Sequence, residues 1–382
     1  MKVINTEKLP IKLWLEDIEE SAMAQVRNLA NLPFAFRHIA IMPDSHCGYG
    51  MPIGGVLATK GVIIPNAVGV DIGCGMCAVK TSIQDLDIDI LKAILGNIRE
   101  TIPVGFAHNK TQCELPEAEY GKIIETQIES AKYQLGSLGG GNHFIEIQKD
   151  EEGFIWIMIH SGSRNLGKQV ADAYNKIAVN LNEQWYSEVP KVQELAFLPL
   201  DSEEGKAYIK EMNYCVEFAL TNRHIMMNRV KNAFGNHYRS SIEFGDMINI
   251  AHNYARMENH FGQNVMVHRK GATLATEDTV GIIPGSQGSK SYIVKGLGNP
   301  ESFNSCSHGA GRKMGRKQAE RTLNLEEEIK KLDDQGILHA IRGVHDLDEA
   351  SGAYKDISEV MDNQKDLVEI IHELTPLAVI KG

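Results

Sequence analysis

The stretch V-G-V-D-I-G-C-G-M-C, residues 68–77, presents a carboxylate and a thiol together on a glycine-rich turn. Asp71 and Cys74 lie on either side of Gly73, and glycine lets the backbone take positive φ values and lets other groups approach closely. A hard oxygen ligand beside a soft sulfur ligand suits a borderline divalent metal better than Mg²⁺ or Ca²⁺ alone. On this stretch alone, a glycine-rich turn with a buried, inert cysteine is an equally good interpretation. Cys77 completes a C-x-x-C pair, but no second pair follows it, so we interpret Cys77 as a packing residue.

Four later segments repeat this design with a histidine beside glycine or small polar residues. A lone histidine at the end of an apolar strand is usually a core residue, but four such segments together with the Asp71 turn favour a metal centre. One cysteine, one aspartate and three histidines exceed the needs of a single tetrahedral ion, and they suit two ions if the thiolate bridges. Neighbouring polar residues can orient such ligands. The histidines are His143, His160, His252 and His308, and the polar neighbours are Asn142, Ser161 and Asn253.

The composition sets the class of protein. With 382 residues, of which 43% are hydrophobic, the chain can build one large domain or two ordinary ones. A net charge of -11 argues against a non-specific nucleic-acid coat protein, but it leaves room for an enzyme with a local basic groove. The six cysteines follow no disulfide spacing, and neither a secretory signal nor a membrane-spanning run is evident, so we expect a cytoplasmic protein.

The hydrophobic pattern predicts an α+β fold. The motifs run from Asp44 to Lys381 without a linker, which favours one intertwined domain over residues 1–382. The periodicity predicts one or two long helices over 201–238, a helix near His252 and a helix starting at Gly309. It also predicts a closing pair of strands at 367–371 and 377–380.

Two polar stretches are typical of phosphate binding. The loop I-P-G-S-Q-G-S-K-S-Y, residues 283–292, offers hydroxyl and backbone N–H groups, although it lacks the G-K-[ST] ending of a Walker A motif and is equally compatible with a plain turn. Basic residues follow His308 on what we expect to be one helix, whose glycine-rich N-terminus would favour anions. A solvated charged face would normally mix signs, whereas these residues are mostly positive: Arg312, Lys313, Arg316, Lys317 and Arg321.

Taken together, the motifs resemble the RtcB family of RNA ligases. The resemblance covers nearly the whole chain from Met42 onward and rests on D-I-G-C-G, G-G-G-N-H-F-I-E, H-S-G-S-R, H-N-Y, P-G-S-Q-G-S-K-S-Y, S-H-G-A-G-R and A-Y-K-D-I. It implies mixed and antiparallel sheets surrounded by helices, with a central dinuclear metal site. It also implies a GTP- and Mn²⁺-dependent ligase of RNA repair or tRNA splicing that joins 3′-phosphate or 2′,3′-cyclic phosphate ends to 5′-hydroxyl ends. In such enzymes a histidine takes GMP from GTP and passes it to the RNA 3′-phosphate, and attack by the 5′-hydroxyl then releases it.

The resemblance assigns a role to each matching residue. Cys74 would bridge two Mn²⁺ ions, with Asp71 and His143 completing one site and His160 and His252 the other. His308 would be the guanylylated nucleophile, and Asp44 would lie near the RNA ends. The GTP site would be lined, besides His308, by Asn142, Glu146, Asn253, Ser286, Ser291, Ala310, Gly311, Tyr354 and Lys381. We expect RNA phosphates to contact Arg164, Arg312, Arg316 and Lys317.

The chain departs from the family pattern at a few positions without losing a ligand or the nucleophile. Ser45 replaces the usual valine after M-P-D, Cys47 is additional, and Asn165 replaces a glycine after H-S-G-S-R. Two other classes of function stay open at this point. One is a dinuclear metal phosphodiesterase or cyclic-phosphate hydrolase, which would not need His308 or the GTP-lining residues. The other is an RNA-binding or chaperone-like protein without catalysis, which the intact ligands make the weakest alternative.

Overall fold

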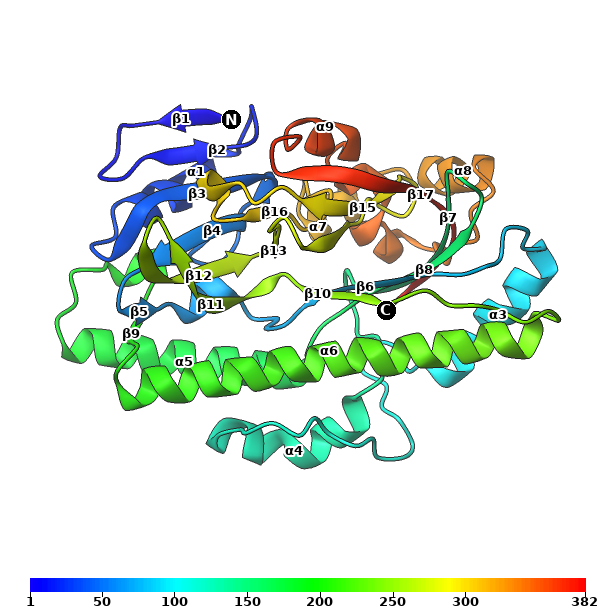
Figure 1. The fold of residues 1–382 in the computed structure, drawn as a ribbon, viewed down its shortest axis with the longest axis horizontal. Helices are drawn as coiled ribbons and strands as arrows, with labels where there is room; N and C mark the ends of the chain where they lie inside the picture. The colour runs from blue at the N-terminus through cyan, green and yellow to red at the C-terminus, as the bar shows by residue number, and fades with distance from the viewer.

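Two large β-sheets carry the chain, and long helices lie along one side of them (Figure 1). The computed structural model describes all of residues 1–382. The first sheet has the strand order β1-β2-β3-β4-β12-β11 and the second the order β10-β6-β8-β7-β17-β15-β14. Two small sheets, β13-β16 and β5-β9, complete the β structure. Neighbouring strands run antiparallel except for the parallel pair β2 and β3, so the predicted α+β class with mixed and antiparallel sheets is confirmed.

The strands of the first sheet are β1 Lys2–Ile4, β2 Ile11–Leu13, β3 Ala35–His46, β4 Ile53–Thr59, β12 Gln263–Lys270 and β11 Asn253–His260. Those of the second are β10 Ile248–Ala251, β6 Gly75–Lys80, β8 Ile155–Ser161, β7 Phe144–Asp150, β17 Val368–Lys381, β15 Ser291–Gly296 and β14 Val280–Ile283. The small sheets are formed by β13 Ala272–Leu274, β16 Ser305–Ser307, β5 Val62–Ile63 and β9 Leu198–Pro199.

The helices vary widely in length. The α-helices are α1 Glu20–Ala30, α2 Pro65–Val68, α3 Ile88–Thr101, α4 Lys122–Gln134, α5 Arg164–Gln184, α6 Glu203–His237, α7 Arg316–Thr322, α8 Leu325–Asp334 and α9 Ile357–Asp362. Short 3₁₀ turns occur at η1 Lys191–Gln193, η2 Pro300–Ser302, η3 Val344–Glu349 and η4 Ser351–Ala353. None of the helices combines the length and apolar character needed to cross a lipid bilayer.

Helix α6 packs against one face of the second sheet, where it contacts β6, β8 and β10. Its 35 residues form one continuous helix, begun by the Ser202 hydroxyl, which accepts a hydrogen bond from the Gly205 N–H. Figure 1 shows α5 and α6 side by side beneath the sheets, with α4 beyond them. The Met and aromatic residues of α6, including Tyr214, Phe218 and Met226, are buried core residues, as their helical spacing predicts.

Strand register gathers the polar motifs at one end of four neighbouring strands. Cys74 precedes β6, His143 precedes β7, His160 is the second-last residue of β8, and His252 follows β10. Within the pairs, Gly75 lies opposite Ser161 and Ala251. A Cβ on Gly75 would lie 1.9 Å from the Ile250 carbonyl oxygen, so only glycine lets β10 approach β6 at this point. Residues far apart in sequence therefore meet at a common sheet edge.

Three predictions about elements are wrong. His252 lies between strands β10 and β11 and not on a helix, because Ala251 before it pairs with Gly75 and Asn253 after it pairs with Lys270. The segment after Gly309 stays non-helical until Arg316, because Gly311 is left-handed (φ 73°) and Arg312 forms a bridge with Tyr354. The closing pair of strands is one strand, β17, which passes Pro376 through a register shift.

Candidate metal centre and nucleotide cavity

Two overlapping groups of side chains have the spacing of metal ligands. Asp71, Cys74 and His143 form one group, and Cys74, His160 and His252 form the other; in each, the ligand atoms lie within 4.8 Å of one another. The Cys74 Sγ belongs to both and lies 3.4 Å from His143 Nε2 and 3.3 Å from His160 Nε2. The Asp71 carboxylate lies 3.2 Å from His143 Nε2. This is the division into two sites that the resemblance implies.

The chemistry of this ligand set fits a pair of divalent cations. The imidazoles are kept neutral, because burial first and neighbouring imidazoles second lower the pKa of both His160 and His252 well below the ordinary value. Burial and then the Asp71 carboxylate raise the pKa of the Cys74 thiol, so a thiolate here requires a cation beside it. The Nδ1 atoms of His143 and His252 are buried without a hydrogen-bond partner. Such a buried, electron-rich cluster is stabilised by bound metal.

The polar residues next to the histidines act mainly through the backbone or on neighbouring turns. His160 Nδ1 lies 3.0 Å from the backbone carbonyl of Asn142, which fixes the tautomer that leaves Nε2 for a metal. Asn253 binds the Asp71 carbonyl and accepts from the Gly271 N–H. Ser161 donates to the Leu138 carbonyl. These contacts hold the turns that present the ligands.

Sequence reasoning missed the contribution of helix α6 to this centre. The Arg223 guanidinium donates to the carbonyls of Gly73 and Ser161, 3.0 and 2.8 Å away. The neighbouring Asn222 donates to the Gly162 carbonyl and the Ser161 hydroxyl. Both side chains are fully buried. Adjacent polar residues facing the core of an otherwise amphipathic helix were the available signal, and they clamp the turns of the cluster together.

His308 extends the row of imidazoles towards an open cavity. Its ring centroid lies 4.8 Å from that of His252, which is 5.2 Å from that of His160. His308 Nδ1 lies 2.6 Å from the Asp44 carboxylate, and the backbone N–H of His308 donates to the same oxygen at 3.0 Å. Since a carboxylate only accepts, Nδ1 carries the hydrogen, and Nε2 is left with its lone pair.

The resemblance implies that Asp44 lies near the RNA ends, whereas in the structure its carboxylate contacts His308. Its side chain is fully buried against His308 rather than open to the cavity. Burial opposes ionisation, but the facing imidazole outweighs it and lowers the pKa of Asp44. A Cβ on Gly311 would lie 2.1 Å from the Asp44 carbonyl oxygen, which explains the second glycine of S-H-G-A-G-R. Asp44 is therefore placed to orient His308.

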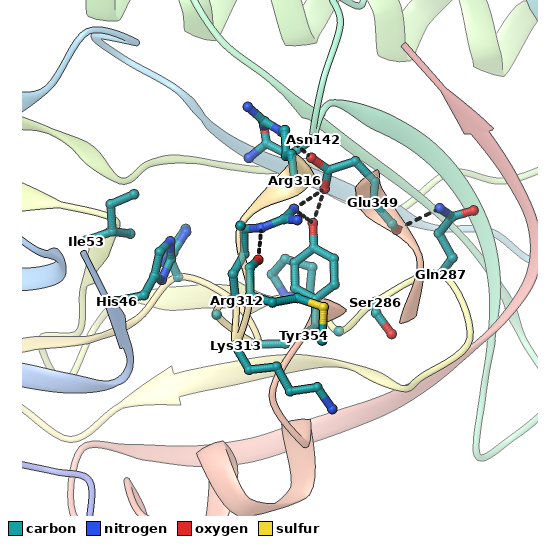
Figure 2. A pocket seen from close by; sticks show the side chains of 18 of the residues that line it. His46, Ile53, Asn142, Ser286, Gln287, Arg312, Lys313, Arg316, Glu349 and Tyr354 are labelled. Carbon is teal, nitrogen blue, oxygen red and sulfur yellow. Dashed lines mark hydrogen bonds and ion pairs between the residues drawn. The ribbon is translucent and has the colours of Figure 1, made fainter. Parts of the chain in front are cut away.

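A cavity of about 800 Å³ opens beside His308 and His160. Figure 2 shows Asn142, Ser286, Arg312 and Tyr354 around it, contributed by loops from distant parts of the chain. Most residues that the resemblance assigns to GTP line this cavity: Asn142, Glu146, Ser286, His308, Ala310, Gly311, Tyr354 and Lys381. Of the residues expected at RNA phosphates, Arg312, Arg316 and Lys317 line it as well.

Three of the expected residues do not line the cavity. Ser291 is fully buried, and its hydroxyl accepts from the Gly285 N–H and from Gln148, which fixes the serine-rich loop. Asn253 supports the metal-ligand turn instead. Arg164 donates to the Ser137 hydroxyl and the Gly105 carbonyl, so it braces the loop before His143. Each was identified by its neighbours in sequence, which do not reveal the direction of a side chain.

Glu349 is a second residue that sequence reasoning missed. Figure 2 shows Arg312, Arg316 and Tyr354 converging on its carboxylate, with ion-pair distances of 3.0 Å to Arg312 and 2.8 Å to Arg316. Burial opposes its ionisation, but Lys381 and then Arg312 outweigh this and lower its pKa. Glu146, in contrast, has its pKa raised to about 8 by burial. The cavity thus combines clustered cations with two carboxyl groups whose pKa values are shifted in opposite directions.

Comparison with known proteins shows the family to which the chain belongs. A family model described as "tRNA-splicing ligase RtcB" matches residues 25–131 and 107–382. The "RNA-splicing ligase RtcB" of Escherichia coli (strain K12) is 38% identical over 412 residues, which cover 100% of this chain and 99% of the relative. The "tRNA-splicing ligase RtcB" of Methanococcus maripaludis is 32% identical over 97% of this chain and 93% of its own length. With its metal-ligand groups, its buried Asp44–His308 pair and these full-length matches, the chain belongs to the RtcB family.

Proposed function

We propose that this protein is an RNA ligase that joins a 3′-phosphate or 2′,3′-cyclic phosphate end to a 5′-hydroxyl end, with GTP as the source of a histidine-bound GMP. The observation that carries the proposal is the position of His308. Its ring stands between the His252 imidazole and the open cavity. The hydrogen bond from Nδ1 to Asp44 fixes the tautomer in which Nε2 keeps its lone pair. The names and full-length similarity of the relatives support the same activity.

In the first step, His308 Nε2 attacks the α-phosphorus of GTP. A P–N bond forms, the bond between the α-phosphorus and the bridging oxygen breaks, and pyrophosphate leaves with the bonding electrons. The imidazole gains positive charge as it bonds, and the buried Asp44 carboxylate stabilises that charge through Nδ1–H. Arg312, Arg316 and Lys381 provide positive charge in the cavity for the triphosphate.

Two Mn²⁺ ions would be held by Asp71, Cys74 and His143 on one side and by Cys74, His160 and His252 on the other. When bound, these ions would supply positive charge that neutralises phosphate oxygens, and they would offer coordination positions to the substrate. Thiolate and imidazole ligands bind Zn²⁺ more strongly than Mn²⁺. The assignment of Mn²⁺ therefore comes from the family resemblance and not from the ligand types.

The remaining steps return His308 to its starting state. An oxygen of the RNA 3′-phosphate attacks the GMP phosphorus, the P–N bond breaks, and the RNA carries a 3′-linked GMP. The 5′-hydroxyl of the second RNA then attacks the 3′-phosphorus, gives up its proton, and releases GMP. A 2′,3′-cyclic phosphate must first be opened by water to the 3′-phosphate. The tRNA or damaged RNA that is repaired, and a cytoplasmic setting, are predictions from the sequence.

A hydrolase without a covalent step is less well supported. Metal-assisted hydrolysis would use the two ligand groups alone and would have no need of the Asp44–His308 pair. It would also leave the cation-rich cavity beside His308 without a role. A binding protein without catalysis would not need His308 Nε2 kept free.

A ligation assay tests the proposal. One RNA with a 3′-phosphate and one with a 5′-hydroxyl are incubated with protein, Mn²⁺ and either GTP or ATP. We expect joined RNA with GTP, little with ATP, and none with His308→Ala. His345→Ala is the matched control, because His345 is 96% exposed and should keep full activity. Joining that needs no nucleotide, or that survives in His308→Ala, would rule out the proposed route.

A further inference from the structure

Phe106 is a large apolar side chain that contacts water over its whole surface. It is fully exposed, and its neighbour Val104 is partly exposed as well. A single exposed apolar residue is common on protein surfaces, so the significance of Phe106 depends on where its loop is held. The segment between α3 and α4 that carries it contains no helix or strand. The backbone that carries the ring is therefore held by loop hydrogen bonds and not by a helix or strand.

The loop around Phe106 is fixed by side chains and backbone. The Gly105 N–H donates to the Gly139 carbonyl at 2.8 Å, and Arg164 donates to the Gly105 carbonyl at 2.7 Å. Asn109 donates to the Leu135 carbonyl at 2.7 Å. With these bonds on both sides of Phe106, the ring is presented from an anchored support, which lowers the entropy lost when a partner binds it.

This support adjoins the metal-ligand turn. Gly139 lies between Arg164 and His143: a Cβ at Gly139 would lie 2.3 Å from the guanidinium of Arg164 and 2.4 Å from His143 Nδ1. The Asp71 side chain, next to His143, is 33% exposed although it does not line the nucleotide cavity. The ligand group is thus open to solvent on a side other than the cavity. Phe106 is joined to this turn through its neighbour Gly105, which is hydrogen-bonded to Gly139.

We propose that Phe106 stacks on a nucleobase of the RNA strand whose end is held at the metal centre. The inference rests on the proposed function and specifies how that function positions its substrate. Aromatic rings bind bases of any identity because every base has a π-face, and nearby positive charge attracts the strand. Arg164 beside Gly139 and Arg316 beside Gly141 provide that charge along the loop 139–141. A partner protein would require a wider apolar patch than Phe106 and Val104 form.

Binding of a single-stranded RNA with a 3′-phosphate, measured by fluorescence anisotropy with Mn²⁺ and without GTP, tests the stacking. We expect Phe106→Ala and Phe106→Leu to weaken binding by about 5- to 150-fold, since base–aromatic stacking contributes roughly 1–3 kcal/mol per base. Phe106→Trp should bind like the wild type because it keeps a ring. Tyr186→Ala is the control, because Tyr186 is 92% exposed and follows the end of α5 opposite to Arg164.

A base analogue locates the contact. With 2-aminopurine placed in turn at each position near the RNA 3′ end, one position should change fluorescence on binding wild type and Phe106→Trp but not Phe106→Leu. An abasic nucleotide at that position should weaken wild-type binding and leave Phe106→Leu unchanged. Equal affinity of wild type and Phe106→Leu would overturn the inference, as would a loss that persists with the abasic RNA. Because no GTP is present, these outcomes are independent of whether His308 becomes guanylylated.

Discussion

At the residue scale, the reactivity proposed for His308 depends on Asp44, 264 positions earlier in the chain. Asp44→Asn keeps the shape of the side chain but removes the charge that stabilises the imidazolium character developing at His308. We expect guanylylation from α-labelled GTP to slow by roughly 100-fold or more, by analogy with the loss of an orienting carboxylate in a catalytic triad. Ser45→Ala is the matched control, because the Ser45 hydroxyl is buried without a partner. Equal rates for Asp44→Asn and Ser45→Ala would remove Asp44 from the mechanism.

The proposed bridge makes Cys74 the most sensitive metal ligand. Because its Sγ belongs to both ligand groups, Cys74→Ala should lower the bound manganese by about two ions per chain after loading and desalting. Cys77→Ala should retain both ions, because Cys77 lies in the hydrophobic core among Val79 and Ile159. Metal analysis of the two variants provides the comparison. A Cys74→Ala protein that keeps its full manganese content would exclude the bridging role.

The residue scale is also where sequence reasoning was strongest and where its limit is clearest. The sequence predicts Asp71, Cys74 and three of the histidines as metal ligands because ligand residues flanked by glycine occur in short, local patterns, and the fold brings these side chains together. Glu349 was missed because its partners, Arg312 and Arg316, reach it only in the folded chain. Ser291 was placed on the cavity because its neighbours are there, although its own hydroxyl faces the interior.

At the scale of elements, the basic segment after His308 is a loop followed by the short helix α7. Arg312 and Arg316 are paired with Glu349, whereas Lys317 has no ion-pair partner. The left-handed backbone of Gly311 explains why a periodic charge pattern did not produce a helix directly after His308. The run of basic residues predicted one helix starting at Gly309, which is wrong because charge does not determine φ. The role of these residues at RNA phosphates stays a prediction.

This segment should set the salt dependence of RNA binding. Replacing Arg316 and Lys317 together by alanine should lower the slope of log K against log salt by about 0.7 per lost phosphate contact for a single strand. Anisotropy titrations at several salt concentrations measure the slope. Lys330→Ala is the control, because Lys330 is paired with Asp334 on α8. A slope that is the same in the double variant and the wild type would assign both charges to solvent.

At the scale of the whole molecule, buried Lys270 links stability to pH. Its ammonium donates to the carbonyls of Tyr49 and Asn66, and burial lowers its pKa to about 7. Between that value and the ordinary 10.5, the unfolded chain binds a proton that the folded chain does not. Stability contributed by this group therefore rises with pH across the window, by at most about 1.4 kcal/mol per pH unit.

Lys270→Met removes this linkage. Urea unfolding at pH 7.5 and 9 should show that the wild type gains stability relative to Lys270→Met at the higher pH. Glu146, whose pKa is raised to about 8, contributes an opposite slope below that pH, but it is present in both proteins and cancels in the comparison. The same pH dependence in both proteins would show that Lys270 is not buried as an amine.

The overall fold was predictable in class but not in topology. Alternating and helical periodicities indicate strands and helices, and these predicted the α+β class and the long helix α6. They do not indicate that β10 and β11, which meet at His252, belong to different sheets. That crossing brings His252 to His160 and His308, and it depends on pairings between residues over 170 positions apart, such as Ala251 with Gly75. One domain over residues 1–382 stays a prediction.

Incubation with α-labelled GTP and Mn²⁺ tests the central claim most directly. The wild type should retain label on His308 through a P–N bond, which is labile in acid and stable in alkali. His308→Ala should retain none, still bind manganese, and still join RNA supplied with a pre-made 3′-guanylylated end, because that RNA bypasses the first step. Label that persists on His308→Ala, or that maps to a lysine of the wild type, would contradict the account.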